Sequence, residues 1–152
     1  MESLEIARWA GRTLRGVVCK ESWGETAWFY NPGGFFANGS YFMTIKSSDG
    51  PNDRASSLDR HGVWRLSFAL PIDEFEQRFG PRPARPPKGG VCEGAWSYDA
   101  LDVLTPHPVY GWMGWAAVNA PSRRSFEALK PLIRLAHLRA KRGFEARAKE
   151  AA

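Results

Sequence analysis

Hydrophobic and polar residues alternate most clearly in the middle of the chain, over residues 63–70. One side of this segment carries Trp64, Leu66, Phe68 and Leu70, and the other side carries Val63, Arg65, Ser67 and Ala69. Successive side chains of a β-strand point to opposite faces of a sheet. The segment is therefore predicted to form a strand with one buried face.

The spacing of apolar residues predicts further elements on both sides of this strand. In chain order they are a helix over residues 4–18, strands over 26–31 and 41–46, a short helix over 71–80, a strand over 112–119 and a long helix over 122–149. Pro131 lies inside the last helix, where its missing N–H group predicts a kink or a break. Consecutive strands with short links favour an antiparallel sheet. We therefore expect an α+β fold in which about four antiparallel strands pack against N- and C-terminal helices.

Length and composition are those of one ordinary globular domain. The chain has 152 residues, of which 43% are hydrophobic and 24% charged. A chain of this length buries enough surface to form a real core. We expect one domain over residues 1–152, with a proline- and arginine-rich connector at 80–90 and a basic tail at 141–152.

The cysteines and the N-terminal sequence bear on the compartment of the protein. Cys19 and Cys92 are far apart and form no Cys-x-x-Cys pair, so two buried or idle thiols in a reducing compartment are expected. The first residues lack the charged region and the apolar run of a secretory signal, and no stretch is apolar for long enough to span a membrane. The sequence predicts a cytoplasmic protein with no membrane partner.

Positive charge is concentrated at the C-terminal end of the chain. Residues 1–120 hold 12 lysines and arginines against 13 acidic residues, whereas residues 121–152 hold nine against three. Such a cluster can contact nucleic-acid phosphates, and a solvated helix face would have the same composition. The residues that would carry nucleic-acid binding are Arg139, Lys141, Arg142, Arg147 and Lys149.

The short motifs of catalysis and cofactor binding are absent from the sequence. It contains no Gly-x-x-x-x-Gly-Lys-Ser/Thr loop, no Gly-x-Gly-x-x-Gly, no His-Glu-x-x-His and no Gly-x-Ser-x-Gly. No cofactor is therefore predicted. No metal site is predicted either, because Asp53, Asp59 and His61 lack the spacing of a known metal motif.

A loop over residues 49–61 is dense in charged and polar side chains. Loops of this kind often bind a ligand, because they present polar groups on a rigid scaffold. The same residues can also satisfy one another, since Asn and Asp cap backbone N–H groups and arginines pair with acids. The candidate binding residues of the loop are Asn52, Asp53, Arg54, Asp59 and Arg60.

A second polar segment holds His107 between two prolines and beside large aromatic residues. A rigidly mounted imidazole suits a ligand contact or an acid/base role near neutral pH. A histidine that only packs, or caps the end of an element, fits the pattern as well. Tyr110 and Trp112 would cover a ligand bound at His107, and an enzyme would need this histidine as general acid or base, oriented by an acidic side chain of the polar loop.

Several short runs of residues together resemble a family of small uncharacterised bacterial proteins. The resemblance covers residues 23–138 approximately and is carried by Trp23-Gly24-Glu25, Asn31-Pro32-Gly33-Gly34, Tyr41-Phe42, Ile45-Lys46, Asn52-Asp53-Arg54-Ala55-Ser56, Leu58-Asp59-Arg60 and Pro106-His107-Pro108-Val109-Tyr110-Gly111-Trp112-Met113. More distantly, the order of these segments is similar to the MmcQ/YjbR-like proteins, and this similarity implies an α+β fold with an antiparallel sheet. The long polar loop and the proline-rich connector depart from that pattern. The resemblance implies no catalytic residues.

The sequence supports the hypothesis of a small cytoplasmic binding module for a small polar or anionic ligand. Its site would form where the strand ending at Lys46, the polar loop and the histidine segment meet. The residues predicted to line it are Lys46, Asn52, Asp53, Arg54, Asp59, Arg60, His107, Tyr110 and Trp112. Nucleic-acid binding by the basic C-terminal helix and catalysis by His107 stay open as alternatives.

Overall fold

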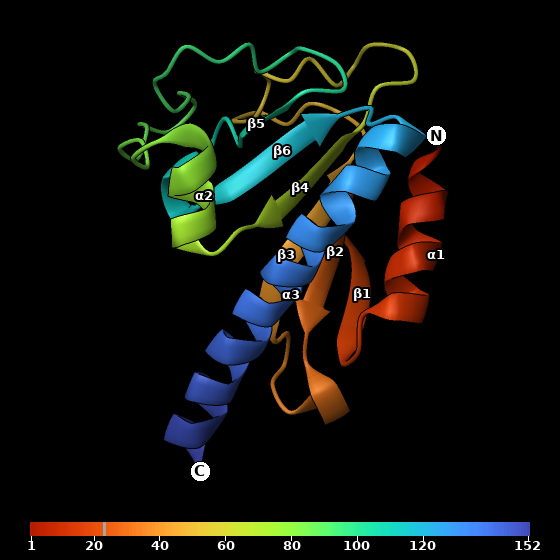
Figure 1. Ribbon diagram of the computed structural model, residues 1–152, viewed down its shortest axis with the longest axis vertical. Coiled ribbons are helices and arrows are strands. Elements are labelled where there is room, and N and C mark those ends of the chain that lie inside the picture. Colours follow the sequence, from red (N-terminus) through yellow and green to blue (C-terminus); the bar gives the residue numbers. More distant parts are fainter. Residues whose placement is uncertain (23) are drawn as a thin grey trace.

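The computed structural model describes residues 1–22 and 24–152, so Trp23, one of the residues of the family resemblance, lies outside the described part. Within this part, six strands form one antiparallel sheet in the order β1-β2-β3-β4-β6-β5 (Figure 1). The elements are α1 (Ser3–Thr13), β1 (Val17–Ser22), β2 (Glu25–Tyr30), β3 (Ser40–Lys46), β4 (Arg65–Ala69), α2 (Ile72–Phe79), β5 (Leu104–Pro106), β6 (Trp115–Asn119) and α3 (Arg123–Ala151). The predicted α+β class and the antiparallel sheet are confirmed.

The predicted number of about four strands is wrong, because two strands lack a clear signal in the sequence. The prediction extends the first helix to residue 18, whereas α1 ends at Thr13 and β1 begins at Val17. Gly16, with a φ of 72°, makes the turn between them. The ring of Tyr30 packs so closely there that a Cβ atom on Gly16 would lie 2.8 Å from it. β5 has only three residues, too few for an alternating pattern.

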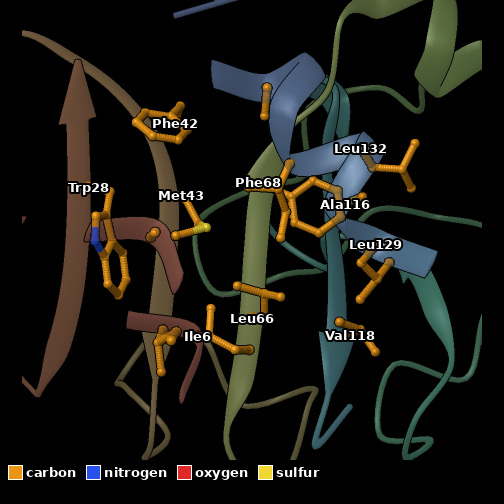
Figure 2. Packing of buried hydrophobic residues seen from close by; sticks show 14 of the residues in the cluster. Ile6, Trp28, Phe42, Met43, Leu66, Phe68, Ala116, Val118, Leu129 and Leu132 are labelled. Carbon is orange, nitrogen blue, oxygen red and sulfur yellow. The ribbon is translucent and has the colours of Figure 1, made fainter. Parts of the chain in front are cut away.

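α3 lies across one face of the sheet and covers its apolar side (Figures 1 and 2). The register of β3, β4 and β6 aligns two apolar rows under this helix, namely Ile45, Leu66 and Val118, and Met43, Phe68 and Ala116. Leu129 and Leu132 of α3 and Ile6 of α1 belong to the same buried cluster. Burial of one such large side chain contributes about 1.5–3 kcal/mol to stability. The core therefore fixes α3 on the sheet.

The helix is not broken at Pro131, because α3 runs as one element from Arg123 to Ala151. Proline removes the N–H group that would bond the carbonyl four residues earlier, that of Glu127. Both Pro131 and Glu127 lie on the exposed side of the helix, where water can take the place of the missing donor.

The second face of β4 is also buried, which corrects the expectation that only one face of this central strand would be covered. Arg65 and Ser67 are 2% and 0% exposed. Irregular segments supply their cover, since Ser56 contacts Arg65, and the amide of Asn119 donates to two carbonyl groups of the loop before β5. These irregular segments gather at one end of the sheet (Figure 1).

Two further sequence predictions concern the cysteines and the membrane. Both cysteines are free thiols, of which Cys92 is buried and Cys19 is exposed. Burial raises the pKa of each thiol, which keeps both thiols protonated at neutral pH. No helix in the described part of the chain has the length and the apolar character that a membrane crossing needs.

Candidate ligand-binding site

A pocket of about 210 Å³ opens on the polar face of the sheet. It lies where the end of β3, the loop that follows β3 and the segment that follows β5 meet. The lining residues are Glu25, Tyr41, Thr44, Lys46, Gly50, Pro51, Asn52, Asp53, Arg65, His107, Val109, Tyr110 and Trp115. Five of the nine residues predicted to form a ligand site, Lys46, Asn52, Asp53, His107 and Tyr110, are therefore neighbours around one pocket.

Strand register explains why the floor of the pocket is polar. Lys46 of β3 pairs with Arg65 of β4, and Arg65 pairs with Asn119 of β6. Two residues away, Thr44 pairs with Ser67. Because side chains alternate along each strand, these residues share the face opposite α3.

Arg65 and Asp53 form a buried, two-pronged ion pair at the base of the pocket. Arg65 Nη1 donates to Asp53 Oδ1 at 2.9 Å, and Nη2 donates to Oδ2 at 2.5 Å. Arg65 Nη1 also donates to Ser56 Oγ at 2.9 Å. Burial of Asp53 opposes its ionisation, but the hydrogen bonds and the charge of Arg65 outweigh it and lower the pKa of Asp53 to about 2. Asp53 is therefore a carboxylate whose two oxygens are already engaged.

Lys46 is the positive group of the pocket that keeps donor capacity for a ligand. Its Nζ atom lies 3.7 Å from Asp53 Oδ2, beyond the usual hydrogen-bond distance. Its side chain is only 15% exposed. The absence of a side chain at Gly50 makes room for the ammonium group, because a Cβ atom there would lie 3.0 Å from Lys46 Nζ. Gly50 and Asp53 exchange two backbone hydrogen bonds, which close the turn beside the lysine.

His107 is 3% exposed and held in one tautomer by its own loop. Its Nδ1 atom accepts hydrogen bonds from the backbone N–H groups of Val109 and Tyr110, each at 3.0 Å. Burial, together with the positive charges of Arg65 and Lys46, places the pKa of His107 well below its ordinary value. The ring is therefore neutral at neutral pH, with its proton on Nε2.

Within the described part of the chain, no acidic side chain pairs with His107, although catalysis by this residue would need such a partner. Both oxygens of Asp53 bind Arg65, and Asp59 Oδ1 accepts the backbone N–H of Asp49. The hydrogen bonds to His107 Nδ1 come from backbone groups instead. In this geometry the imidazole is a fixed hydrogen-bond donor through Nε2.

Aromatic side chains form the outer wall of the pocket. Tyr41 OH donates to Glu25 Oε1 at 2.8 Å, and the ring of Tyr41 lies 4.8 Å from that of Trp115. Burial, followed by the neighbouring Glu25 carboxylate, raises the pKa of Tyr41. Tyr110 packs on His107 with ring centroids 4.9 Å apart and is 45% exposed. Aromatic rings therefore line the pocket beside its polar residues.

Sequence reasoning missed five pocket residues that the strands supply, which are Glu25, Tyr41, Thr44, Arg65 and Trp115. One signal for Arg65 was available, since a charged residue inside an otherwise apolar strand segment needs a partner when it is buried. Glu25 and Trp115 lie on other strands than Lys46 and join the pocket only through strand pairing, which the local pattern does not reveal.

Four predicted site residues lie outside this pocket. Arg60 donates to backbone carbonyls of Ser56, Ser57 and Asp99, so it ties the polar loop together. Asp59 caps a backbone N–H within the same loop. Arg54 is exposed. Trp112 lines a neighbouring hollow of about 320 Å³ beside the proline-rich connector, where the guanidinium of Arg85 lies 5.0 Å from the Trp112 ring centroid.

The basic C-terminal residues also differ from one another in their surroundings. Arg139 Nη1 donates to the carbonyls of Leu70 and Met113, at 2.6 and 3.1 Å. Arg147 packs over the ring of Phe36 at 4.2 Å and donates to the carbonyl of Gly39. These two arginines fasten α3 to the rest of the molecule. The remaining three predicted nucleic-acid contacts are exposed, namely Lys141, Arg142 and Lys149.

An antiparallel α+β architecture with a small polar pocket describes a class of protein but no activity. The chain belongs to a family of unknown function, DUF6194, whose model matches residues 1–149. The predicted membership in a family of unknown function is thereby confirmed. No curated protein and no solved structure matches the chain. A function for this chain therefore has to be argued from its own residues.

Proposed function

We propose that the protein is a binding module for a small polar molecule that carries an anionic group. The observation that carries the proposal is the convergence of Lys46, Asn52 and His107, from three separate segments, on one pocket. Its volume of about 210 Å³ lies below the range of about 300–1,000 Å³ of sites for drug-sized ligands. The ligand class is therefore small metabolites with a carboxylate or a phosphate.

Each polar side chain has a distinct part in this proposal. The Lys46 ammonium group binds the anionic group, because its nearest described carboxylate oxygen is 3.7 Å away and charge-assisted hydrogen bonds are the strong ones. His107 Nε2–H and the amide of Asn52 supply directional contacts. The Arg65–Asp53 pair does not bind the ligand but holds the polar loop against the sheet. Tyr110 covers the bound molecule.

The geometry favours a donor role of His107 over acid/base catalysis. A general base needs a free ring nitrogen, but Nδ1 already accepts two backbone N–H groups. Proton uptake at His107 is also opposed by burial and by two nearby positive charges. Binding without turnover is therefore the function that the site supports best.

We also infer that the fold is related to the MmcQ/YjbR-like proteins. This inference is supported by the order of a Trp-Gly-Glu segment, a strand ending at Lys46, a strand ending at Asn119 and a terminal helix. The relation adds no site residue, and the polar loop and the connector have no counterpart in that pattern.

Thermal unfolding with a panel of small anions tests the proposed function. Phosphate, acetate and succinate are compared with the uncharged succinamide, at concentrations far above the expected dissociation constants. A ligand present at about 100 times its dissociation constant stabilises a protein by about 2.7 kcal/mol, which raises the Tm of a chain of this size by about 5–10 °C. We expect this rise with at least one anion and not with succinamide.

Matched variants assign the binding to the pocket. Lys46→Gln is expected to abolish the rise in Tm, and Lys149→Gln, an equal loss of charge on the exposed tail, is expected to retain it. His107→Asn keeps an acceptor for the two backbone N–H groups but removes the Nε2 donor, and is expected to weaken binding about tenfold. A panel without effect, or a rise that Lys46→Gln retains, would contradict the proposal.

A further inference from the structure

A second surface of the molecule lies on the opposite side of the sheet from the pocket, along the seam between α1 and the first half of α3. The two helices lie side by side with their N-terminal ends together (Figure 1). Trp9 of α1 meets Phe126 of α3 edge to face at 5.4 Å, and Glu5 of α1 pairs with Arg123 of α3. Two hollows of about 560 and 470 Å³ open along this seam.

The seam is strongly basic. Its two hollows are lined by eight lysines and arginines, namely Arg8, Arg12, Arg15, Arg123, Arg124, Lys130, Arg134 and Lys141. Only two acidic residues line them, Glu5 and Glu127. Each acid already has a basic partner, Arg123 for Glu5 and Lys130 for Glu127. The excess of positive charge in the seam is therefore not neutralised by its own acids.

Folding brings this charge together from two parts of the sequence. The arginines of α1 belong to an N-terminal region whose charges balance, so the charge distribution along the chain does not reveal them. Arg8 and Arg12 stand four residues apart on one helix face, a spacing at which like charges destabilise a helix. Six of the basic residues are exposed and make no ion pair within the described part of the chain, namely Arg8, Arg12, Arg15, Arg124, Arg134 and Lys141. An anionic partner would relieve this repulsion.

We propose that the α1/α3 seam binds the phosphate backbone of a nucleic acid. Six of its eight basic residues are arginines, whose guanidinium group matches phosphate with two parallel hydrogen bonds. The stretch of α3 from Arg123 to Lys141 is about 27 Å long at 1.5 Å per residue, which equals about eight nucleotide steps of one duplex strand. A row of phosphates therefore matches the seam in both charge and length.

The seam is expected to bind without reading the base sequence. Trp9, its central aromatic residue, is only 8% exposed. The charged groups of Lys130 and Arg134 lie over the Trp9 ring, each 5.7 Å from its centroid. No base can stack on a ring that is covered in this way. Contacts to phosphates alone give binding that is independent of sequence and strongly dependent on salt.

Two triple variants of the full chain separate the seam from the basic tail. Arg8→Gln, Arg12→Gln and Arg124→Gln together remove three exposed charges from the seam. Arg78→Gln, Arg142→Gln and Lys149→Gln together form the tail variant, which removes three exposed charges outside the seam, one in α2 and two in the basic tail. Glutamine has nearly the helix propensity of arginine and lysine, so thermal unfolding of both variants is expected to match that of the parent protein.

Fluorescence anisotropy with a labelled single strand and a labelled duplex, between about 50 and 200 mM salt, measures the interaction. We expect the parent protein and the tail variant to bind, and the seam variant to lose at least about tenfold in affinity. Each phosphate contact contributes about 0.7 to the logarithmic salt slope for a single strand and about 0.9 for a duplex, so three lost contacts lower the slope by about two to three.

Three results would overturn the proposal. The first is no binding to either nucleic acid at about 50 mM salt, the low end of a range over which phosphate contacts weaken steeply. The second is an equal loss of affinity in the tail variant and the seam variant, which would mean that net charge alone matters. The third is equal binding of a labelled polyglutamate of the same charge as the single strand, which would assign the seam to acidic proteins.

Discussion

The two faces of the central sheet are built from the same strands but are stabilised in different ways. On the face under α3, Leu66 and Phe68 pack in apolar rows that need only the correct size and spacing. On the opposite face, Arg65 and Ser67 are buried just as deeply, under irregular segments. The polar face depends on particular partners, and it holds the pocket. The alternation of residues therefore determines the strand, whereas specific polar contacts form the site.

Some of the polar atoms that are buried on the polar face lack a hydrogen-bond partner. Arg65 Nε and Ser67 Oγ are buried and have no hydrogen-bond partner within the described part of the chain. A buried polar group without a partner costs about 1–3 kcal/mol. On the polar face, some substitutions that remove an unpaired polar atom are therefore expected to leave stability intact. On the apolar face, most substitutions that remove carbon atoms are expected to lower stability.

The largest contrast is expected between two neighbours on β4. Phe68 and Ser67 are both 0% exposed and point to opposite faces. Phe68→Ala is expected to lower the free energy of unfolding by about 3–5 kcal/mol because it leaves a cavity. Ser67→Ala is expected to raise it by up to about 1 kcal/mol because it removes an unpaired hydroxyl. Urea unfolding measures both, and a loss of more than about 1 kcal/mol for Ser67→Ala would show that its hydroxyl is hydrogen-bonded.

A somewhat smaller effect is expected at the ion pair below the pocket. Asp53→Ala leaves Arg65, which is 2% exposed, without its charge partner, and is expected to cost about 3 kcal/mol. Adding Arg65→Met to Asp53→Ala removes the stranded charge and is expected to recover more than half of that loss. A double variant no more stable than Asp53→Ala alone would show that Arg65 does not need Asp53. Urea unfolding at neutral pH gives the required free energies.

A pH-dependent effect is expected from His107. In the unfolded chain its imidazole takes up a proton near pH 6.5, whereas burial and two positive neighbours keep the pKa of the folded group well below that value. Below about pH 6.5 the unfolded state therefore binds more protons than the folded state. The contribution of neutral His107 to the free energy of unfolding is complete above about pH 6.5 and falls by up to about 1.4 kcal/mol per pH unit below it.

The comparison of two histidine variants isolates this pH effect. His107→Asn removes the titrating group and is expected to flatten the fall in unfolding free energy between about pH 6.5 and pH 5. His61 lies exposed in a turn, and His61→Asn is expected to leave the fall unchanged. An unchanged slope in His107→Asn would mean that His107 can take up a proton in the folded protein.

The sequence predicts the helix-covered face better than the polar face, for a physical reason. The apolar rows follow from local periodicity, which predicts β4, α2 and α3 close to their observed bounds. Local periodicity does not reveal the strand of residues 17–22, because its valines continue the apolar spacing of the helix before it. Local periodicity also does not show that α3 continues through Pro131, which lies on an exposed side of the helix.

Prediction of the pocket succeeds for loop residues and for Lys46 at the end of β3, and it fails for residues on neighbouring strands. Lys46 and His107 stand out in the sequence because polar groups concentrate around them. Arg65 and Glu25 join them only through pairing with β3, which depends on contacts distant in sequence. Arg60 is the opposite case, a residue predicted to bind a ligand that instead donates to backbone carbonyls. Composition alone does not distinguish these two roles of an arginine.

The smallest effect on stability is expected from a single methyl group placed at the edge of the pocket. A Cβ atom at Gly50 would lie 3.0 Å from Lys46 Nζ, the mobile end of a long side chain that can move aside. Gly50→Ala is therefore expected to change the free energy of unfolding by less than about 1 kcal/mol, while it displaces the ammonium group from the pocket. Affinity for any anion that stabilises the parent protein would then fall as it does in Lys46→Gln.

The matched change on the apolar face is Ala136→Val in α3, at a residue that is 0% exposed. Added carbon atoms in a packed core cost about 1–3 kcal/mol, so this substitution is expected to lower stability and to leave anion affinity intact. Thermal unfolding with and without the anion separates the two quantities for each variant. If Gly50→Ala retains full affinity, Lys46 does not hold the ligand from its present position. If instead Ala136→Val lowers affinity as much as Gly50→Ala, the pocket depends on the packing beneath α3 as well as on its own polar contacts.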